Sequence, residues 1–138
     1  MLKDESNLIH AELSRKIIGV LMNVHNTLGY GHPEKTYQRA VAIGLKDSGL
    51  SFEEQVYAPL LFNGKIVGRN YFDFKVENII VLELKKGDYF AKAHIDQVYQ
   101  YLVSSNLQLG LLVYFAPRKV HWKRIVNLHP YIRKISNP

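Results

Sequence analysis

Two predicted strands and the turn between them are encoded by the stretch Asp73-Phe74-Lys75-Val76-Glu77-Asn78-Ile79-Ile80-Val81-Leu82-Glu83-Leu84-Lys85. Side chains alternate across a strand, so Glu83 and Lys85 share one face, while Leu82 and Leu84 point the other way, into apolar packing. Asp73 lies on the preceding strand, and an antiparallel hairpin would bring it beside Glu83. We therefore expect two acids and a base to meet at the end of a hydrophobic strand.

Two neighbouring carboxylates favour a divalent metal site, because a cation between them removes their mutual repulsion. Carboxylate oxygens suit Mg²⁺ or Mn²⁺. Such an ion polarises a phosphoryl oxygen and lowers the pKa of its bound water. Lys85 would position or deprotonate the attacking water, or stabilise the developing charge. The alternative is a surface Glu-Lys pair at a strand end with Asp73 in solvent, the commoner origin of such a short motif.

Hydrophobic periodicity predicts the elements on either side of this stretch. Apolar residues at helical spacing indicate a helix over about residues 8–28, ended by Gly29-Tyr30-Gly31. A second helix begins near Pro33 and ends near Ser48-Gly49. Strands are expected at 52–62, 65–76, 79–85, 109–115 and 120–126, with a hairpin turn at Asn63-Gly64 and a helix over 92–104. This order predicts an α/β fold of the α+β type, with a mixed sheet covered by helices.

The composition fits one globular domain over residues 1–138, with a core at about 9–128 and a basic tail after Pro130. Hydrophobic residues make up 47% of the chain, and it has no cysteine, which excludes disulfides and thiolate metal sites. The N-terminus has no signal-peptide pattern, and no apolar run is long enough to cross a bilayer. We therefore expect a cytoplasmic protein without a membrane partner.

The net charge of +6 favours a polyanionic partner such as nucleic acid. On the last predicted strand Lys119 and Lys123 share one face and are candidate phosphate contacts. An edge strand guarded by lysines would give the same pattern. A domain of this size has little surface for base readout, so sequence specificity would require a dimer or another partner.

The stretch Leu28-Gly29-Tyr30-Gly31-His32-Pro33-Glu34-Lys35-Thr36-Tyr37-Gln38 resembles the signature of the GxxExxY protein family. Gly31, Glu34 and Tyr37 supply the named positions. The resemblance covers roughly residues 14–128 in the same order and continues through Ala40-Val41-Ala42-Ile43, Gly49-Leu50, Asn63-Gly64-Lys65, Asp73, Val81-Leu82-Glu83-Leu84-Lys85, Gln97 and Leu109-Gly110-Leu111-Leu112. The family looks like a branch of the PD-(D/E)XK nuclease superfamily.

The resemblance implies a restriction-endonuclease-like αβββαβ core and divalent-metal-dependent phosphodiester hydrolysis. It makes Glu34 the helical acid near the metal, and Asp73 and Glu83 metal ligands together with the Leu84 carbonyl. Lys85 becomes the catalytic lysine. Two features depart from the pattern. Phe72 stands where the superfamily's name has proline, and His32-Pro33 replace the apolar residues expected before the helical acid.

Gln97 and Tyr101 match the Q-x-x-x-Y helix of RecB-like members, where the glutamine supports the site. His94 lies on the same predicted helix face, which would look into the cleft. A polar face in solvent is the alternative. With Tyr37, the residues His94 and Tyr101 are candidate substrate contacts.

Together with the resemblance, the sequence predicts a Mg²⁺- or Mn²⁺-dependent nuclease, and analogy with the superfamily favours DNA over RNA as its substrate. A homodimer is compatible with this prediction. A non-catalytic binding module on the same fold, or an accessory subunit active only with a partner, are the alternatives.

Overall fold

The computed structural model describes residues 9–87 and 90–129. Its elements are α2 (Ala11–Leu28), α3 (Glu34–Asp47), β1 (Phe52–Phe62), β2 (Lys65–Val76), β3 (Ile80–Lys86), α4 (Lys92–Ser105), β4 (Leu109–Phe115) and β5 (Val120–Val126). The order and type of these elements confirm the prediction from periodicity. The expected basic tail lies outside the described residues. No helix in the described part of the chain is long and apolar enough to span a membrane.

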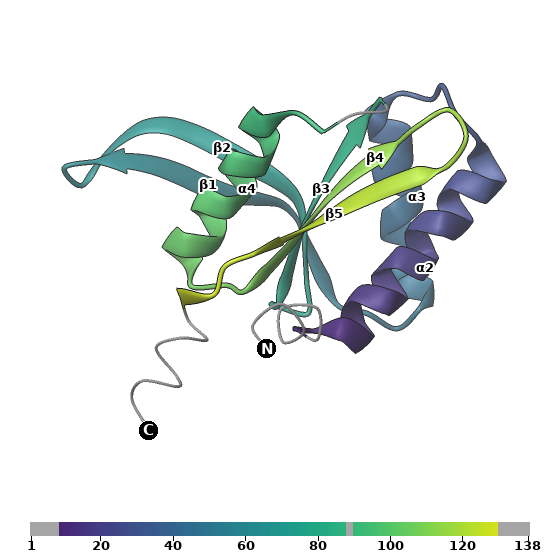
Figure 1. The fold of residues 1–138 in the computed structure, drawn as a ribbon, viewed down its shortest axis with the longest axis horizontal. Coiled ribbons are helices and arrows are strands. Elements are labelled where there is room, and N and C mark those ends of the chain that lie inside the picture. The colour runs from purple at the N-terminus through teal and green to yellow at the C-terminus, as the bar shows by residue number, and fades with distance from the viewer. Residues whose placement is uncertain (1–8, 88–89, 130–138) are drawn as a thin grey trace.

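The five strands form one mixed sheet in the order β1-β2-β3-β4-β5 (Figure 1). Neighbouring strands are antiparallel except β3 and β4, which are parallel and are connected through α4. A parallel pair needs such a crossover because its strands start at the same end of the sheet. The predicted α+β mixed sheet with a crossover helix is therefore confirmed.

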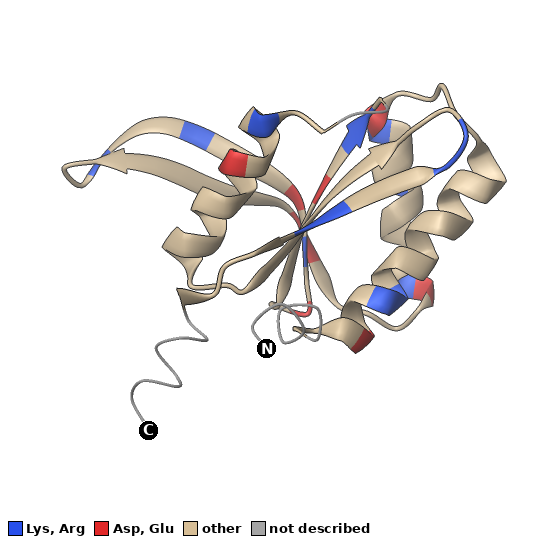
Figure 2. Ribbon diagram, viewed as in Figure 1, with Lys and Arg blue, Asp and Glu red and all other residues tan. Residues whose placement is uncertain are grey.

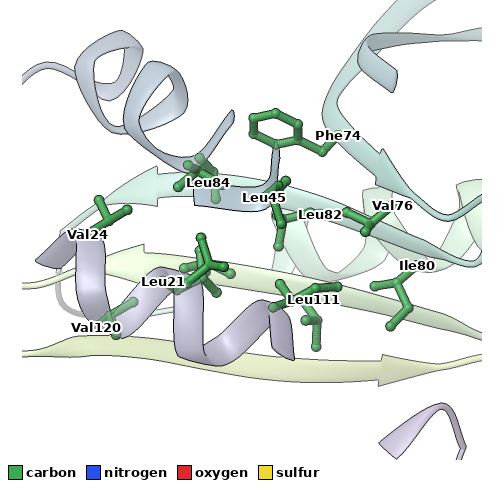
Figure 3. Close-up of a cluster of buried hydrophobic side chains, with 14 of the residues drawn as sticks. Leu21, Val24, Leu45, Phe74, Val76, Ile80, Leu82, Leu84, Leu111 and Val120 are labelled. Atoms are coloured by element: carbon green, nitrogen blue, oxygen red, sulfur yellow. The ribbon is translucent and has the colours of Figure 1, made fainter. Parts of the chain in front are cut away.

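Helices cover both faces of the sheet. On one face α2 and α3 pack over Leu82, Leu84 and Leu111, and part of this core is drawn in Figure 3. On the other face α4 packs over Val81 and Leu112. Adjacent residues of β3 thus enter opposite cores, as the predicted alternation requires.

The β1–β2 hairpin extends beyond the rest of the sheet (Figure 1). β2 pairs with β3 only from Phe74 to Val76, whereas it pairs with β1 as far as Lys65. Residues 56–72, here called the arm, therefore form a two-stranded ribbon. Two strands alone are marginally stable in water, and α4 supports this ribbon through Phe72, whose ring lies 4.7 Å from that of Tyr101.

At its base, the hairpin changes the face to which its side chains point. Phe74 packs in the core under α2 and α3, whereas Phe72 packs under α4, although an uninterrupted strand would place both on one face. Between them the register leaves Gln55 and Asp73 unpaired, and Gln55 has a φ of 50°. The irregularity takes Asp73 out of the regular ladder, so both its main chain and its carboxylate are available for other contacts.

Candidate active site

The carboxylates of Asp73 and Glu83 meet where β2 and β3 separate. The main-chain N–H of Asp73 donates to Glu83 Oε1 at 3.1 Å, and the N–H of Leu84 donates to Asp73 Oδ2 at 2.7 Å. Side-chain oxygens thus accept the hydrogen bonds that main-chain carbonyls would accept in a continued ladder. These reciprocal bonds hold the two acids side by side, in the pairing expected from the hairpin.

Glu83 is only 8% exposed, and its pKa is raised to about 8. Burial is the largest cause, since it disfavours the charged form, and the charge of Asp73 adds to it. The ammonium of Lys85, 3.8 Å from Glu83 Oε2, partly offsets both effects. A carboxyl in this position favours a proton or a bound cation.

Glu34, the first residue of α3, connects that helix to the end of β3. Its Oε2 accepts the N–H of Lys86 at 3.1 Å, and Lys86 Nζ lies 3.4 Å from the carbonyl oxygen of Gly31. Figure 2 shows the acidic start of α3 beside the basic end of β3. The Gly31 and Glu34 positions of the signature therefore link the loop before α3 to β3.

A cleft of about 450 Å³ opens beside these residues, between α3 and the base of the β1–β2 hairpin. It is lined by Glu34, Lys35, Gln38, Arg39, Glu54, Gln55, Asp73 and Leu84. Acidic groups from α3, β1 and β2 thus face one space together with two cations of α3. The cleft has the charges needed to hold a metal ion and a phosphate at the same place.

Five of the lining residues were not predicted from the sequence. Lys35 and Arg39 are four residues apart and therefore share one face of α3, a signal that the sequence contains. Glu54 and Gln55 lie opposite the Asp73 region. Their partners cannot be predicted by counting residues from the hairpin turn, because the register shifts between residues 60 and 61. Gln38 carries no signal that separates it from an ordinary surface residue.

His94 of α4 lies on the other side of Lys85. Its Nδ1 is 2.7 Å from the hydroxyl of Tyr114, and Tyr114 is the β4 neighbour of Lys85. Burial lowers the pKa of His94, the charge of Lys85 lowers it further, and the charge of Glu34 opposes both. His94 is therefore close enough to Lys85 and to Glu34 for both charges to affect it.

Gln97 and Tyr101 do not line the cleft with Glu34 and Asp73. They line a separate groove of about 250 Å³ between α4 and the arm. Tyr101 is largely buried against Phe72. Within the described residues, no hydrogen bond connects Gln97 to the site carboxylates. The predicted face of α4 thus borders two different places. His94 lies beside the candidate site, whereas Gln97 and Tyr101 lie beside the arm.

Tyr37 belongs to the core, which corrects the prediction that it contacts a substrate. Its side chain is fully buried, and its ring stacks on Phe115 at 4.2 Å between centroids. Its hydroxyl donates to the carbonyl oxygen of Gly29. Tyr37 therefore fixes the loop before α3 from inside the protein.

Lys119 and Lys123 are exposed near or on β5. Lys123 is paired with Leu112, which in turn is paired with Glu83. Residues in one such row point to the same side of a sheet. Lys123 thus lies on the side of Glu83 and Lys85, two strands away.

The donor chemistry of the site fits a hard divalent cation. Asp73 and Glu83 supply carboxylate oxygens, and Leu84, which also lines the cleft, has a main-chain carbonyl. No group of three or more His, Asp and Glu side chains is already gathered around one point in the described residues. Mg²⁺ does not require such a cage, because it retains several waters and is commonly held by one or two carboxylates and substrate phosphates.

A family model described as the PD-(D/E)XK nuclease superfamily matches residues 11–125. The chain belongs to this superfamily. Members of the PD-(D/E)XK superfamily are typically phosphodiester-cleaving nucleases and generally use divalent metals. The αβββαβ order and the mixed sheet agree with the restriction-endonuclease-like fold.

A solved structure gives the same fold. The crystal structure of SSO0001 matches with a TM-score of 0.50 and 19% sequence identity, over 75% of this chain and 55% of that chain. The present chain thus spans little more than half the length of that structure, and the likeness concerns the fold alone. No curated protein matches the sequence.

Proposed function

We propose that this PD-(D/E)XK chain is a Mg²⁺- or Mn²⁺-dependent nuclease of the GxxExxY type that hydrolyses phosphodiester bonds in DNA. The observation that supports it most is the reciprocal pair of hydrogen bonds between Asp73 and the Glu83-Leu84 segment, beside Lys85 and an open cleft. A surface Glu-Lys pair would need neither the buried carboxyl nor the interrupted ladder. The choice of DNA over RNA rests on analogy with the superfamily.

In this proposal Asp73, Glu83 and the Leu84 carbonyl hold the cation, with Glu34 at the rim of the cleft. When bound, the cation supplies Lewis-acid polarisation of a phosphoryl oxygen and lowers the pKa of a coordinated water. The raised pKa of Glu83 supports this assignment, because a second positive charge beside Lys85 would stabilise the ionised carboxylate.

The remaining roles belong to cations and polar groups around the site. Lys85, close to Glu83, orients the attacking water and stabilises negative charge that develops on the phosphate. His94 contacts the substrate near Lys85. On the α4 side of the sheet, opposite the cleft, Gln97 and Tyr101 contact another part of the substrate. Lys123 binds one of its phosphates on that same α4 side.

The test is a cleavage assay with labelled single-stranded, double-stranded and branched DNA and with RNA, in Mg²⁺, Mn²⁺ or EDTA. Asp73→Asn, Glu83→Gln and Lys85→Met should each reduce the rate at least about a hundredfold, the scale expected when a transition-state contact is lost. Glu12→Gln and Lys46→Met make the same charge changes at exposed positions outside the cleft and should cut like the wild type. Cleavage that persists in EDTA or in the three site variants would refute the proposal.

The exposed tip of the arm favours a second candidate, an accessory subunit that is active only with a partner. Leu61, Phe62 and Val67 are more than half exposed, and Phe62 reaches 66%. Apolar side chains gathered at an exposed tip are characteristic of contact surfaces. This candidate is tested by comparing the sedimentation of the wild-type protein and of a Phe62→Ser variant in a cell extract. A heavier complex that only the wild type forms would support it.

A further inference from the structure

An exposed aromatic pair lies on the arm. Tyr57 and Tyr71 are cross-strand partners whose ring centroids are 5.3 Å apart, with planes inclined by 37°. Their side chains are 43% and 52% exposed, respectively. Cross-strand aromatic pairs stabilise a hairpin by themselves, so the pair alone does not indicate a ligand.

The position of the pair relative to the cleft is the second observation. Val56 and Phe72, their neighbours in sequence, face α4, so the two tyrosines point to the opposite side of the sheet. That is the side covered by α3, where the cleft opens. Tyr71 is two residues from Asp73, a separation of about 7 Å along a strand.

Basic residues lie on both sides of the cleft. Arg69 is exposed and occupies the next position on the same face of the arm, beyond Tyr71. Lys35 and Arg39 line the cleft from α3. Figure 2 shows basic segments on the β2 part of the arm. One side of the molecule therefore carries, in this order, the two cations of α3, the acidic cleft, the two tyrosine rings and Arg69.

The arm is poorly suited to an added strand from another protein. β1 is the edge strand of the sheet, but Pro59 within it has no N–H to donate. Gln55, with its positive φ, interrupts the same edge. Proline and irregularities at an edge are among the means by which proteins prevent strand addition. A ligand of the arm would thus contact its exposed side chains, the two tyrosines among them, and not its edge.

We propose that the arm binds an unpaired DNA strand, whose bases stack on Tyr57 and Tyr71 and whose phosphates contact Arg69, Lys35 and Arg39. In a duplex the base faces are already stacked on one another, so only an unpaired strand offers them to side chains. This inference rests on the proposed nuclease function and names its substrate as DNA with a single-stranded segment beside the cleaved bond.

Binding is measured first by fluorescence anisotropy in EDTA, with one labelled strand used alone and as a duplex. Replacing both tyrosines by leucine retains apolar area but removes the ring faces, and should weaken single-strand binding at least about tenfold. Tyr57→Phe with Tyr71→Phe should bind within about twofold of the wild type, because the rings remain. Arg69→Ala should also weaken binding.

Matched controls are Tyr99→Leu on the exposed surface of α4 and Arg15→Ala on α2, which should bind as the wild type does. Circular dichroism and thermal melting verify that each variant is folded. If the leucine variant, shown to be folded, binds the single strand like the wild type, or loses duplex binding equally, the inference is overturned. It is also overturned if that variant changes only the protein's sedimentation and not DNA binding, since the arm then serves a protein contact.

A cleavage assay separates this inference from the proposed function. If the wild type cuts DNA and the leucine variant retains the same KM on single-stranded and forked substrates, the nuclease stands and the role of the arm fails. If nothing is cut but single-strand binding depends on both tyrosines, the role of the arm stands and the nuclease fails.

Discussion

At the scale of single residues, Glu83 connects the site to the stability of the protein. Its pKa is 4.5 in an unperturbed chain and about 8 in the folded protein. Between these values the folded state binds more protons than the unfolded state, so the free energy of unfolding falls as pH rises from about 4.5 to about 8. Glu83→Gln removes this titration and should stabilise the protein at pH 8 by at least about 1 kcal/mol.

The measurement is urea unfolding in EDTA at pH 5 and at pH 8. From pH 5 to pH 8 the free energy of unfolding should fall more for the wild type than for Glu83→Gln. Glu12→Gln makes the same substitution at an exposed position of α2, and its free energy of unfolding should change with pH as that of the wild type does. Equal slopes for the wild type and Glu83→Gln would show that the burial of this carboxyl does not oppose its ionisation.

Tyr37 gives a second prediction at this scale. Tyr37→Phe keeps the ring stacked on Phe115 but removes the buried hydrogen bond to the carbonyl oxygen of Gly29. We expect a loss of about 1 kcal/mol in the free energy of unfolding. Because Tyr37 does not line the cleft, the KM of the proposed nuclease for DNA should not change. Tyr57→Phe, at an exposed tyrosine, should leave stability within about 0.5 kcal/mol of the wild type.

At the scale of elements, the fold depends on the close approach of α4 to β4. A Cβ added at Gly110 would lie 2.6 Å from Val98 Cγ1 and 3.0 Å from Val81 Cγ1. These side chains are buried, so α4 would have to move away from the sheet. Gly110→Ala should therefore lower the free energy of unfolding by about 1 to 3 kcal/mol, measured by urea titration.

Gly19 of α2 is the matched position for this change. A Cβ added there meets nothing within 4 Å. Since alanine favours a helix more than glycine does, Gly19→Ala should stabilise the protein by about 0.5 to 1 kcal/mol. A stabilising effect at both glycines would mean that α4 does not pack closely on β4.

The elements themselves could be predicted from the sequence because their periodicities are strong. The 3.6-residue repeat of α2, the alternation of β1 and the Asn63-Gly64 turn are local signals, and local signals are sufficient for the order of elements. The change of face at Gln55 and Asp73 was not predicted. A positive φ at a glutamine follows from tertiary contacts and has no signature in the sequence.

The candidate site could be predicted in part for the same reason. Strand alternation is local, and it places Glu83 and Lys85 on one face. The cleft residues from α3 and β1 depend on how a helix packs over a hairpin, which one sequence does not specify. The arrangement of α4 explains why His94 lies near Lys85 while Gln97 lies toward the arm: a single helix face spans two grooves.

At the scale of the whole molecule, a net charge of +6 coexists with a cleft that gathers acidic groups. In the proposed function, a phosphate backbone is attracted by the molecule as a whole but must be guided locally past Glu34 and Asp73. Lys35 and Arg39, on the exposed face of α3, are positioned to do this. General attraction and local guidance can be distinguished, because each specific phosphate contact releases counterions.

The logarithm of the single-strand binding constant, plotted against the logarithm of salt concentration, measures those contacts. Each lost contact reduces the steepness by about 0.7, so Lys35→Ala with Arg39→Ala should reduce it by about 1.4. Arg15→Ala with Lys46→Ala removes the same net charge at exposed positions away from the cleft and should leave the slope unchanged. If both pairs reduce the slope equally, binding follows net charge alone and α3 does not guide the strand; a reduction only in the first pair places the phosphates along α3, beside Glu34 and Asp73.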